Sequence, residues 1–178
     1  YSREIIGHHE PVVGLLSIGG EATKGNEITK ETYNLLKASP LNFRGNVEGH
    51  DLFEGDVDVA VCDGFVGNVV LKTSESAAHA LTSWLKQEFS RNPVRILGAL
   101  LLRNAFRTMK QKADPAMYGG APLLGVNGIC IIGHGSSSAE AVFNGLRVAA
   151  ESVTHQVNGK IMDQVAAWDA AEEKDAAR

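Results

Sequence analysis

Apolar runs and helical patterns alternate along the first part of the chain. Three apolar runs have the length of buried strands and cover residues 12–17, 41–47 and 57–62. Apolar residues at helical spacing follow the first run at residues 27–37 and the third run at residues 67–90. Strands that alternate with helices are typical of a parallel sheet covered by helices, so the pattern predicts an α/β fold. In such folds ligands bind at the edge formed by the carboxyl ends of the strands.

A second helix is predicted at residues 94–112, directly after Pro93 and with no strand before it. We therefore expect residues 67–112 to form a helical hairpin that protrudes from the sheet. The apolar residues of its first helix have the spacing of a buried stripe, which predicts that they lie in a core or an interface. They are Ala77, Ala80, Leu81, Trp84, Leu85 and Phe89.

The later part of this hairpin is both basic and apolar. Residues 86–112 contain seven basic side chains and a single acid, Glu88. The apolar residues 96–102 are far too few to span a bilayer, which requires about 20 residues. Their setting among arginines suits contact with an anionic membrane surface or with an acidic protein. A dimer contact with a solvated basic rim fits the same composition, and we expect peripheral membrane contact through residues 91–107.

The rest of the chain has a less regular pattern and ends in helices. Residues 121–124 form a short candidate strand, and residues 129–132 form the last strong one. A helix is predicted at residues 139–157, and residues 161–178 are expected to form a helical or frayed acidic tail. Residues 1–7 have the pattern of a helix already under way, so we expect the chain to be part of a longer protein.

Composition narrows the class of protein. With 178 residues, of which 44% are hydrophobic, the chain can bury a core of its own. Its net charge of −4 argues against a general nucleic-acid binder. Cys62 and Cys130 lie in apolar runs without Cys-x-x-Cys spacing, so we expect buried free thiols and a reducing cytoplasm. The histidines other than His134 are scattered along the chain, so neither a metal site nor a cofactor is expected. These scattered histidines are His8, His9, His50, His79 and His155.

Polar residues gather where the third predicted strand gives way to its helix. Asp63 ends the apolar run. In a helix that begins near Gly67, Asn68, Lys72 and Glu75 lie on one face because they are spaced at i, i+4 and i+7. An acid, an amide and an ammonium beside the free N–H groups of a helix start favour an anion. A strand-turn-helix unit with a solvated polar face fits the same spacing.

The turn after the first predicted strand is rich in glycine. Residues 18–27 place Lys24 and Asn26 on either side of Gly25, where both can donate to an oxyanion. Asn26 is also placed to cap the helix that follows. The turn lacks the Gly-Lys-Ser/Thr end of a Walker loop, and a plain glycine turn fits it as well. Glu48 lies just past the next predicted strand.

A third glycine-rich turn leads from the last strong strand to a helix, and we expect it at the same edge of the sheet. It places His134 between Gly133 and Gly135, with Ser136 next. A histidine in this setting is a candidate for proton transfer, although an ordinary structural histidine is the alternative. The turn lacks the third glycine of a dinucleotide fingerprint and is not the Gly-x-Ser-x-Gly elbow of hydrolases.

Five segments, taken in order, resemble a known family. They are LSIG with KGNE at residues 16–27, VEGHD at 47–51, CDGFVGNVVLKTSE at 62–75, YGGAPLLGVNG at 118–128 and GHGSSS at 133–138. From about residue 11 to residue 157 the chain resembles the second half of the PlsX-type phosphate acyltransferases, with departures at Gly20, Ala22 and Ser76. The resemblance implies a three-layer α/β/α sandwich with a mostly parallel sheet, similar to phosphate acetyltransferases and isocitrate dehydrogenase. It implies that residues 1–160 form the C-terminal α/β portion of the enzyme and that the N-terminal half is absent from this chain.

The resemblance also implies an activity and its partners. PlsX-type enzymes transfer a long-chain acyl group from acyl carrier protein to inorganic phosphate and form acyl phosphate for phospholipid synthesis. The implied partners are acyl carrier protein, inorganic phosphate, a second copy of the chain and, from the cytoplasm, the membrane surface. Two alternatives stay open: a coenzyme A-dependent phosphate acetyl- or butyryltransferase, and a noncatalytic fragment for membrane docking or dimerisation.

Matched to this chemistry, the residues divide into two groups. We expect Lys72, His134, Asn68 and Asp63 to be catalytic, with His134 as oxyanion donor or proton carrier. Carboxylates of the site more readily orient its lysines than act as bases, because phosphate is already partly dianionic and a thiolate leaves easily. The expected phosphate-binding residues are Lys24, Gly25, Asn26, Glu48, Gly67, Glu75, Gly135 and Ser136.

Overall fold

The computed structural model describes the backbone of residues 1–112 and 117–176 and the side chains of residues 1–109 and 117–170. Two basic side chains of the predicted hairpin, Lys110 and Lys112, and the end of the predicted tail lie outside the described residues. The chain divides into two compact units. The sheet unit comprises His8–Asn104 with Ser2, and the terminal unit comprises Ala105–Arg178 with Tyr1 and Arg3–Gly7.

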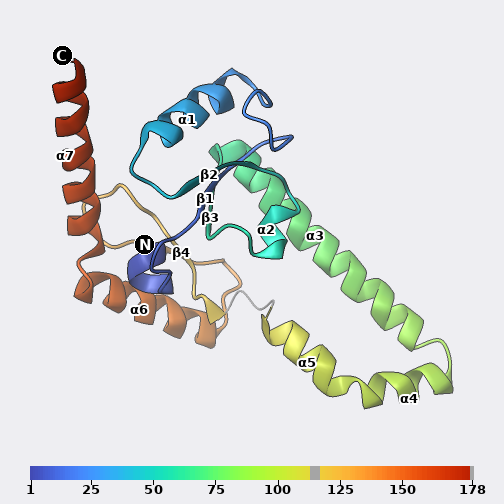
Figure 1. Ribbon diagram of the computed structural model, residues 1–178. Coiled ribbons are helices and arrows are strands. Elements are labelled where there is room, and N and C mark those ends of the chain that lie inside the picture. The colour runs from blue at the N-terminus through green and yellow to red at the C-terminus, as the bar shows by residue number, and fades with distance from the viewer. Residues whose placement is uncertain (113–116, 177–178) are drawn as a thin grey trace. The chain divides into compact units, whose positions relative to one another are not determined.

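A parallel three-stranded sheet forms the centre of the sheet unit (Figure 1). Its strand order is β2-β1-β3, and Leu15 of the central strand pairs in register with Asn46 on one side and Val61 on the other. The side chains of Leu15 and Val47 are almost completely buried. The α/β class and the parallel sheet predicted from the sequence are thus confirmed, and they agree with an α/β/α sandwich. The strands are β1 (Val13–Leu16), β2 (Phe43–Val47) and β3 (Val59–Val61).

The first and third helices of the sheet unit begin at side-chain caps. The Oδ1 atom of Asn26 accepts a hydrogen bond from the Thr29 N–H at 2.9 Å and caps the first helix, as the sequence predicted. Asp63 caps the long third helix, which begins beside the strands and runs away from them (Figure 1). The first three helices of the sheet unit are α1 (Glu27–Ala38), α2 (Asp51–Glu54), which has no side-chain cap, and α3 (Gly64–Phe89).

The single helix predicted at residues 94–112 is wrong, because the structure has two: α4 (Pro93–Leu101) and α5 (Arg103–Lys112). The backbone leaves helical geometry at Leu102, where φ is −87° and ψ is 3°. A break of one residue leaves the spacing of apolar residues on both sides almost unchanged, so the sequence pattern does not reveal it. No described helix combines the length and the apolar character that crossing a membrane requires.

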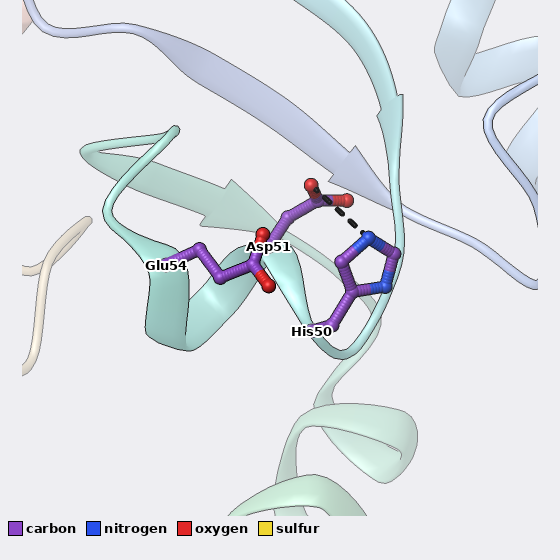
Figure 2. A group of neighbouring side chains, drawn as sticks. All are labelled: His50, Asp51 and Glu54. Atoms are coloured by element: carbon purple, nitrogen blue, oxygen red, sulfur yellow. Dashed lines mark ion pairs between the residues drawn. The ribbon is translucent and has the colours of Figure 1, made fainter.

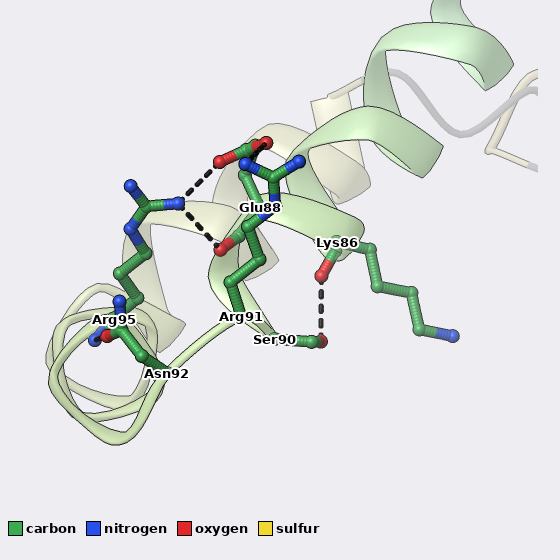
Figure 3. Close-up of polar contacts among 6 residues, drawn as sticks. All are labelled: Lys86, Glu88, Ser90, Arg91, Asn92 and Arg95. Carbon is green, nitrogen blue, oxygen red and sulfur yellow. Dashed lines mark hydrogen bonds and ion pairs between the residues drawn. The ribbon is translucent and has the colours of Figure 1, made fainter.

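A network of charges holds the corner between α3 and α4 (Figure 3). The Glu88 carboxylate pairs with Arg91 at 3.1 Å and also with Arg95. The Ser90 hydroxyl donates to the Lys86 carbonyl at 2.8 Å, and Asn92 caps α4 by accepting from the Arg95 N–H at 2.9 Å. The one acid of this basic segment therefore pairs with the two arginines nearest the start of α4 and offsets one of their two positive charges.

The apolar stripe of α3 is not part of a core within the described residues. Trp84 is 62% exposed and Leu81 is 56% exposed. The same holds for α4, where Leu97 and Leu101 are exposed by 59% and 79%. The prediction that the apolar stripe of α3 lies in a core is therefore wrong, whereas the alternative that it lies in an interface stays a prediction.

The terminal unit has a two-stranded antiparallel sheet instead of the predicted extension of the parallel sheet. Strand β4 (Ala121–Pro122) pairs with β5 (Ile131–Ile132), so the turn with His134 does not follow a strand of the β2-β1-β3 sheet. The apolar run at residues 129–132 indicated a buried parallel strand, because periodicity alone does not reveal the partner of a strand.

Helices make up the rest of the terminal unit. Gly119 approaches the backbone of Gly145 so closely that a Cβ atom there would lie 2.2 Å from the Gly145 nitrogen. The helix predicted at residues 139–157 ends early, because Gln156 adopts a positive φ of 53° between two helices. The tail is helical as far as it is described. Besides α5, the helices of the terminal unit are the π-helix η1 (Ser2–Ile6), α6 (Ala139–Thr154) and α7 (Val157–Ala176).

The prediction that both thiols are buried is wrong, since Cys62 and Cys130 are exposed free cysteines. Strand β3 ends at Val61, so Cys62 already lies in the turn that leaves the sheet. Cys130 precedes the two-residue strand β5, whose sheet is too small to cover both of its faces.

Candidate functional site

The carboxyl ends of the three parallel strands meet at one edge of the sheet, and most of the predicted site residues of the sheet unit follow these ends. The glycine loop, residues 17–26, follows the central strand β1. Glu48 follows β2, and Asp63 follows β3 and starts α3. Because β1 lies between β2 and β3, the glycine loop is flanked by the other two strand ends. This is the edge at which open α/β sheets bind their ligands.

The glycine loop is held to the sheet by its own backbone. The Ser17 N–H donates to the Val47 carbonyl at 2.9 Å, and the Lys24 N–H donates to the Glu21 carbonyl at 3.0 Å. Gly25 has a φ of +100°, and a Cβ atom there would lie 2.1 Å from the Thr29 hydroxyl oxygen. Glycine is therefore required for the packing of the loop itself, and the loop presents the Lys24 side chain to solvent.

The Oδ1 atom of Asn26 accepts hydrogen bonds within the helix cap, whereas its amide nitrogen is available to a ligand. Its Oδ1 atom accepts from the backbone N–H of Thr29 at 2.9 Å and from the Thr29 hydroxyl at 3.1 Å. The amide nitrogen can still donate, and Asn26 follows Lys24 by two residues at the start of α1. Asn26 can therefore contribute a neutral donor to an anion, together with the cation of Lys24.

Asp63 uses its carboxylate as a helix cap. The Oδ1 atom accepts from the Phe65 N–H and from the Val66 N–H, both at 2.9 Å. The prediction of free N–H groups at this helix start is therefore wrong for these two. A carboxylate already bound to the helix start repels a second anion, so the end of α3 attracts phosphate less than a bare helix end would.

Lys72 and Glu75 form an ion pair on α3. The Lys72 Nζ atom lies 2.9 Å from a Glu75 carboxylate oxygen, and the two side chains are 67% and 64% exposed. Exposed pairs of this kind contribute only about 0.3–0.5 kcal/mol to stability, so the contact positions the lysine more than it holds the helix. Asn68 precedes Lys72 by one turn and is also exposed.

Glu48 leads into a turn that gathers one imidazole and two carboxylates. The Glu48 N–H donates to the Asp51 Oδ2 atom at 2.7 Å, which fixes the start of α2. The ligand atoms of His50, Asp51 and Glu54 lie within 4.8 Å of one another (Figure 2). The sequence suggested no metal constellation, whereas the fold brings together a set of ligand types that suits Zn²⁺ or Mn²⁺. Exposed acidic groups commonly gather without a metal, so the cluster by itself assigns none.

His134 lies in the terminal unit, and its ring is held by Ser136. The Ser136 N–H donates to the His134 Nδ1 atom at 3.2 Å, and the Ser136 hydroxyl lies 2.6 Å from the same atom. A backbone N–H can only donate, so Nδ1 must carry a lone pair and the neutral ring must carry its proton on Nε2. His134 thus offers an exposed N–H donor, and Ser136 is occupied with orienting it.

Two residues of the sheet edge were not predicted as site residues. Asn46 on β2 is only 9% exposed, and its amide nitrogen donates to the Glu21 carbonyl of the glycine loop at 2.8 Å. Ser17 begins the glycine loop and turns its hydroxyl toward Gly25, at 2.9 Å from where a Cβ atom would be. The one signal for Asn46 in the sequence is an asparagine near the end of a predicted strand, in the half of β2 that is buried.

A separate, mainly apolar cavity of about 780 Å³ lies within the terminal unit. It is lined by residues 125–129, by the end of α6 and by α7, and none of the predicted site residues lines it. Its apolar walls suit an apolar group and not an anion, so it is distinct from the phosphate chemistry predicted for the sheet edge.

Comparison with known proteins identifies the family. The family described as "Fatty acid synthesis protein" matches residues 1–160. The chain is 52% identical over 167 residues to a phosphate acyltransferase of Acidobacterium capsulatum, a match that covers 94% of the chain and 50% of that relative. It is 55% identical over 157 residues to a phosphate acyltransferase of Pelotomaculum thermopropionicum, covering 88% and 46%. For the phosphate acyltransferase of Aquifex aeolicus the identity is 52% over 162 residues, covering 91% and 48%. The chain spans about half the length of the curated relatives it matches, and by the extent of these matches it belongs to the family of fatty acid synthesis proteins.

Proposed function

We propose that the chain carries the phosphate-binding part of an enzyme that transfers a long-chain acyl group from acyl carrier protein to inorganic phosphate. The observation that carries the proposal is the sheet edge itself. There the glycine loop with Lys24 and Asn26 lies between the two other strand ends, one of which starts the helix with Lys72. Relatives named phosphate acyltransferase, at about half identity over most of the chain, support the same chemistry.

The reaction is the attack of a phosphate oxygen on a thioester carbonyl. A C–O bond forms and the C–S bond breaks, so hydrogen phosphate and the acyl thioester give acyl phosphate and a thiol. The proton lost by hydrogen phosphate ends on the departing thiolate. Because phosphate is already partly dianionic near neutral pH, the reaction does not require a strong general base. It requires a phosphate held in line with the carbonyl and donors for the oxyanion that develops there.

The side chains of the site divide between these two tasks in the proposed mechanism. Lys24 and Lys72 supply positive charge to the phosphate, and Asn26 and Asn68 supply neutral donors. His134, in the terminal unit, presents an Nε2–H that suits donation to an oxyanion.

The proposal is tested by following thioester loss. The protein to use is this chain joined to the upstream half of the Aquifex aeolicus relative, called here the completed enzyme, with the chain alone in parallel. We expect phosphate-dependent loss of long-chain acyl carrier protein thioester and formation of acyl phosphate. A preference for short acyl-coenzyme A with no requirement for carrier protein would favour the alternative phosphate acetyl- or butyryltransferase. No phosphate-dependent loss with either donor would contradict the proposal.

A second proposed role concerns the exposed apolar face of α4, which we assign to peripheral contact with an anionic membrane. Leu100 and Leu101 are 61% and 79% exposed, and Arg103 follows at the start of α5. Such a face next to basic residues can lie on a lipid surface or pack against a second copy of the chain. Leu100→Glu is expected to weaken binding to anionic liposomes, whereas Ile28→Glu on α1, which also places an acid at an exposed apolar position, is not. Unchanged liposome binding with loss of dimers would favour the second copy.

A further inference from the structure

We infer that Asn46 is the positioning residue of the glycine loop and sets the place of Lys24 for phosphate. The inference rests on the proposed function in one respect, namely that the glycine loop holds phosphate. Asn46 itself is remote from solvent, at 9% exposed, so it acts through the loop and does not touch a ligand from the surface.

A single carbonyl oxygen connects Asn46 to the backbone of Lys24. The Asn46 amide nitrogen donates to the Glu21 carbonyl at 2.8 Å, and the Lys24 N–H donates to the same carbonyl at 3.0 Å. The adjoining strand contact, from the Ser17 N–H to the Val47 carbonyl at 2.9 Å, fixes the start of the loop. The loop is therefore attached to β2 at two places, and the second of these depends on one side chain.

The orientation of the Asn46 amide is determined by the same contact. Were the amide turned over, its oxygen would face the Glu21 carbonyl, and two acceptors would oppose each other. The nitrogen therefore faces the loop, and the oxygen faces the interior of the sheet unit. Among the described residues this Oδ1 atom is buried without a hydrogen-bond partner, and the same is true of the Ser17 hydroxyl oxygen.

A buried acceptor without a partner lowers stability. An apolar side chain at this position would avoid that cost, so the fold alone gives no reason for an asparagine in a buried strand. Residues that reduce stability while they arrange a site are characteristic of functional positions. The two effects of Asn46 can therefore be separated, because one substitution should improve stability and impair the site.

The test compares Asn46→Leu with Asn42→Leu. Asn42 is a matched control, since it precedes the same strand at its other end and its amide nitrogen donates to the Glu10 carbonyl at 3.4 Å. Hydrogen exchange of the amides of residues 19–26 and the affinity for inorganic phosphate are measured on the completed enzyme. For Asn46→Leu we expect exchange in the glycine loop to rise about tenfold and phosphate affinity to fall about tenfold, with a thermal midpoint equal to or above that of the wild type. Asn42→Leu is expected to leave loop exchange and phosphate affinity unchanged.

Two results overturn the inference. One is unchanged exchange in the glycine loop of Asn46→Leu. The other is a lowered thermal midpoint with exchange raised equally throughout the sheet, which would make Asn46 a purely structural residue. Asn46→Asp keeps the size of the side chain and places an acceptor opposite the Glu21 carbonyl, so it must also release the loop. If the wild type binds no phosphate, the proposed function fails, while loop exchange still decides whether Asn46 positions the loop.

Discussion

The Lys72 ammonium lies 2.9 Å from a carboxylate oxygen of Glu75, one turn further along α3. Both side chains are mostly exposed, so the pair adds little to the stability of the helix. Its effect is to limit the directions in which the lysine can point. A lysine held in this way, on the helix that leaves the carboxyl edge of the sheet, is suited to bind an anion.

Lys72→Ala should impair catalysis without unfolding the protein. Loss of a charge-assisted hydrogen bond to phosphate predicts a fall in kcat/KM of about ten- to a hundredfold in the completed enzyme. The thermal midpoint should stay within the small range of ordinary surface substitutions. Lys86→Ala removes another lysine near the far end of α3 and serves as the control, for which we expect wild-type rates. Near-normal activity of Lys72→Ala would remove this residue from the site.

The helix-capping role of Asp63 can be tested separately from the effect of its negative charge. Asp63→Ala removes the acceptor for the Phe65 and Val66 N–H groups and should cost about 1 kcal/mol of unfolding free energy. Asp63→Asn keeps an acceptor and removes the negative charge, so stability should be nearly retained. Phosphate affinity should rise in the Asn variant, because a repelling charge has been removed. If Asp63→Asn instead abolishes turnover while the protein stays folded, the carboxylate has a catalytic role beyond the cap.

The tautomer of His134 can be observed directly. The contact from the Ser136 N–H predicts that the neutral ring carries its proton on Nε2. Nitrogen-15 NMR of the imidazole, recorded above the pH at which the ring titrates, should therefore show Nδ1 unprotonated. Ser136→Ala should lower the share of this tautomer but not reverse it, because the backbone N–H at position 136 remains. A wild-type ring protonated mainly on Nδ1 would exclude the arrangement described for the oxyanion donor.

Acid should loosen the attachment of η1 to α7. The hydrogen bond from Lys160 keeps the pKa of the Glu4 carboxyl below its ordinary value of 4.5. A lowered pKa in the folded state means that the unfolded chain binds more protons, so stability falls as the pH drops through this range. The contribution of Glu4 is present above about pH 4.5 and is lost below the folded pKa. Thermal unfolding of wild type and Glu4→Gln should thus differ at neutral pH and converge in acid, and a difference that persists in acid would show that the charge is not responsible.

Local features of the fold could be predicted from the sequence, whereas features set by distant partners could not. The cap at Asn26 depends on residues three positions apart, and the three parallel strands depend on short apolar runs. The contact between Asn46 and Glu21 joins residues 25 positions apart, so no local sequence pattern predicts it. The exposure of Cys62 follows from where β3 ends, which the apolar run overestimated by one residue.

The candidate site shows the same division. Lys72 and Glu75 were expected on one face of a helix, and their contact follows from helical spacing alone. The group formed by His50, Asp51 and Glu54 was missed, because a histidine next to an acid in a turn is common and only the short helix α2 brings Glu54 back to them. His134 was expected to follow a strand of the parallel sheet, but the strand before it, β5, pairs with β4.

In the proposed reaction a phosphate oxygen attacks the acyl thioester, and isotope labelling can follow that oxygen into the product. The completed enzyme is given acyl carrier protein that carries a long-chain acyl thioester, together with inorganic phosphate labelled with oxygen-18 at every position. The masses of the products are then measured by mass spectrometry. We expect an acyl phosphate that retains every labelled oxygen, formed at a rate that depends on phosphate concentration. Release of unlabelled fatty acid at a rate independent of phosphate would show that water is the nucleophile and would contradict the proposed reaction.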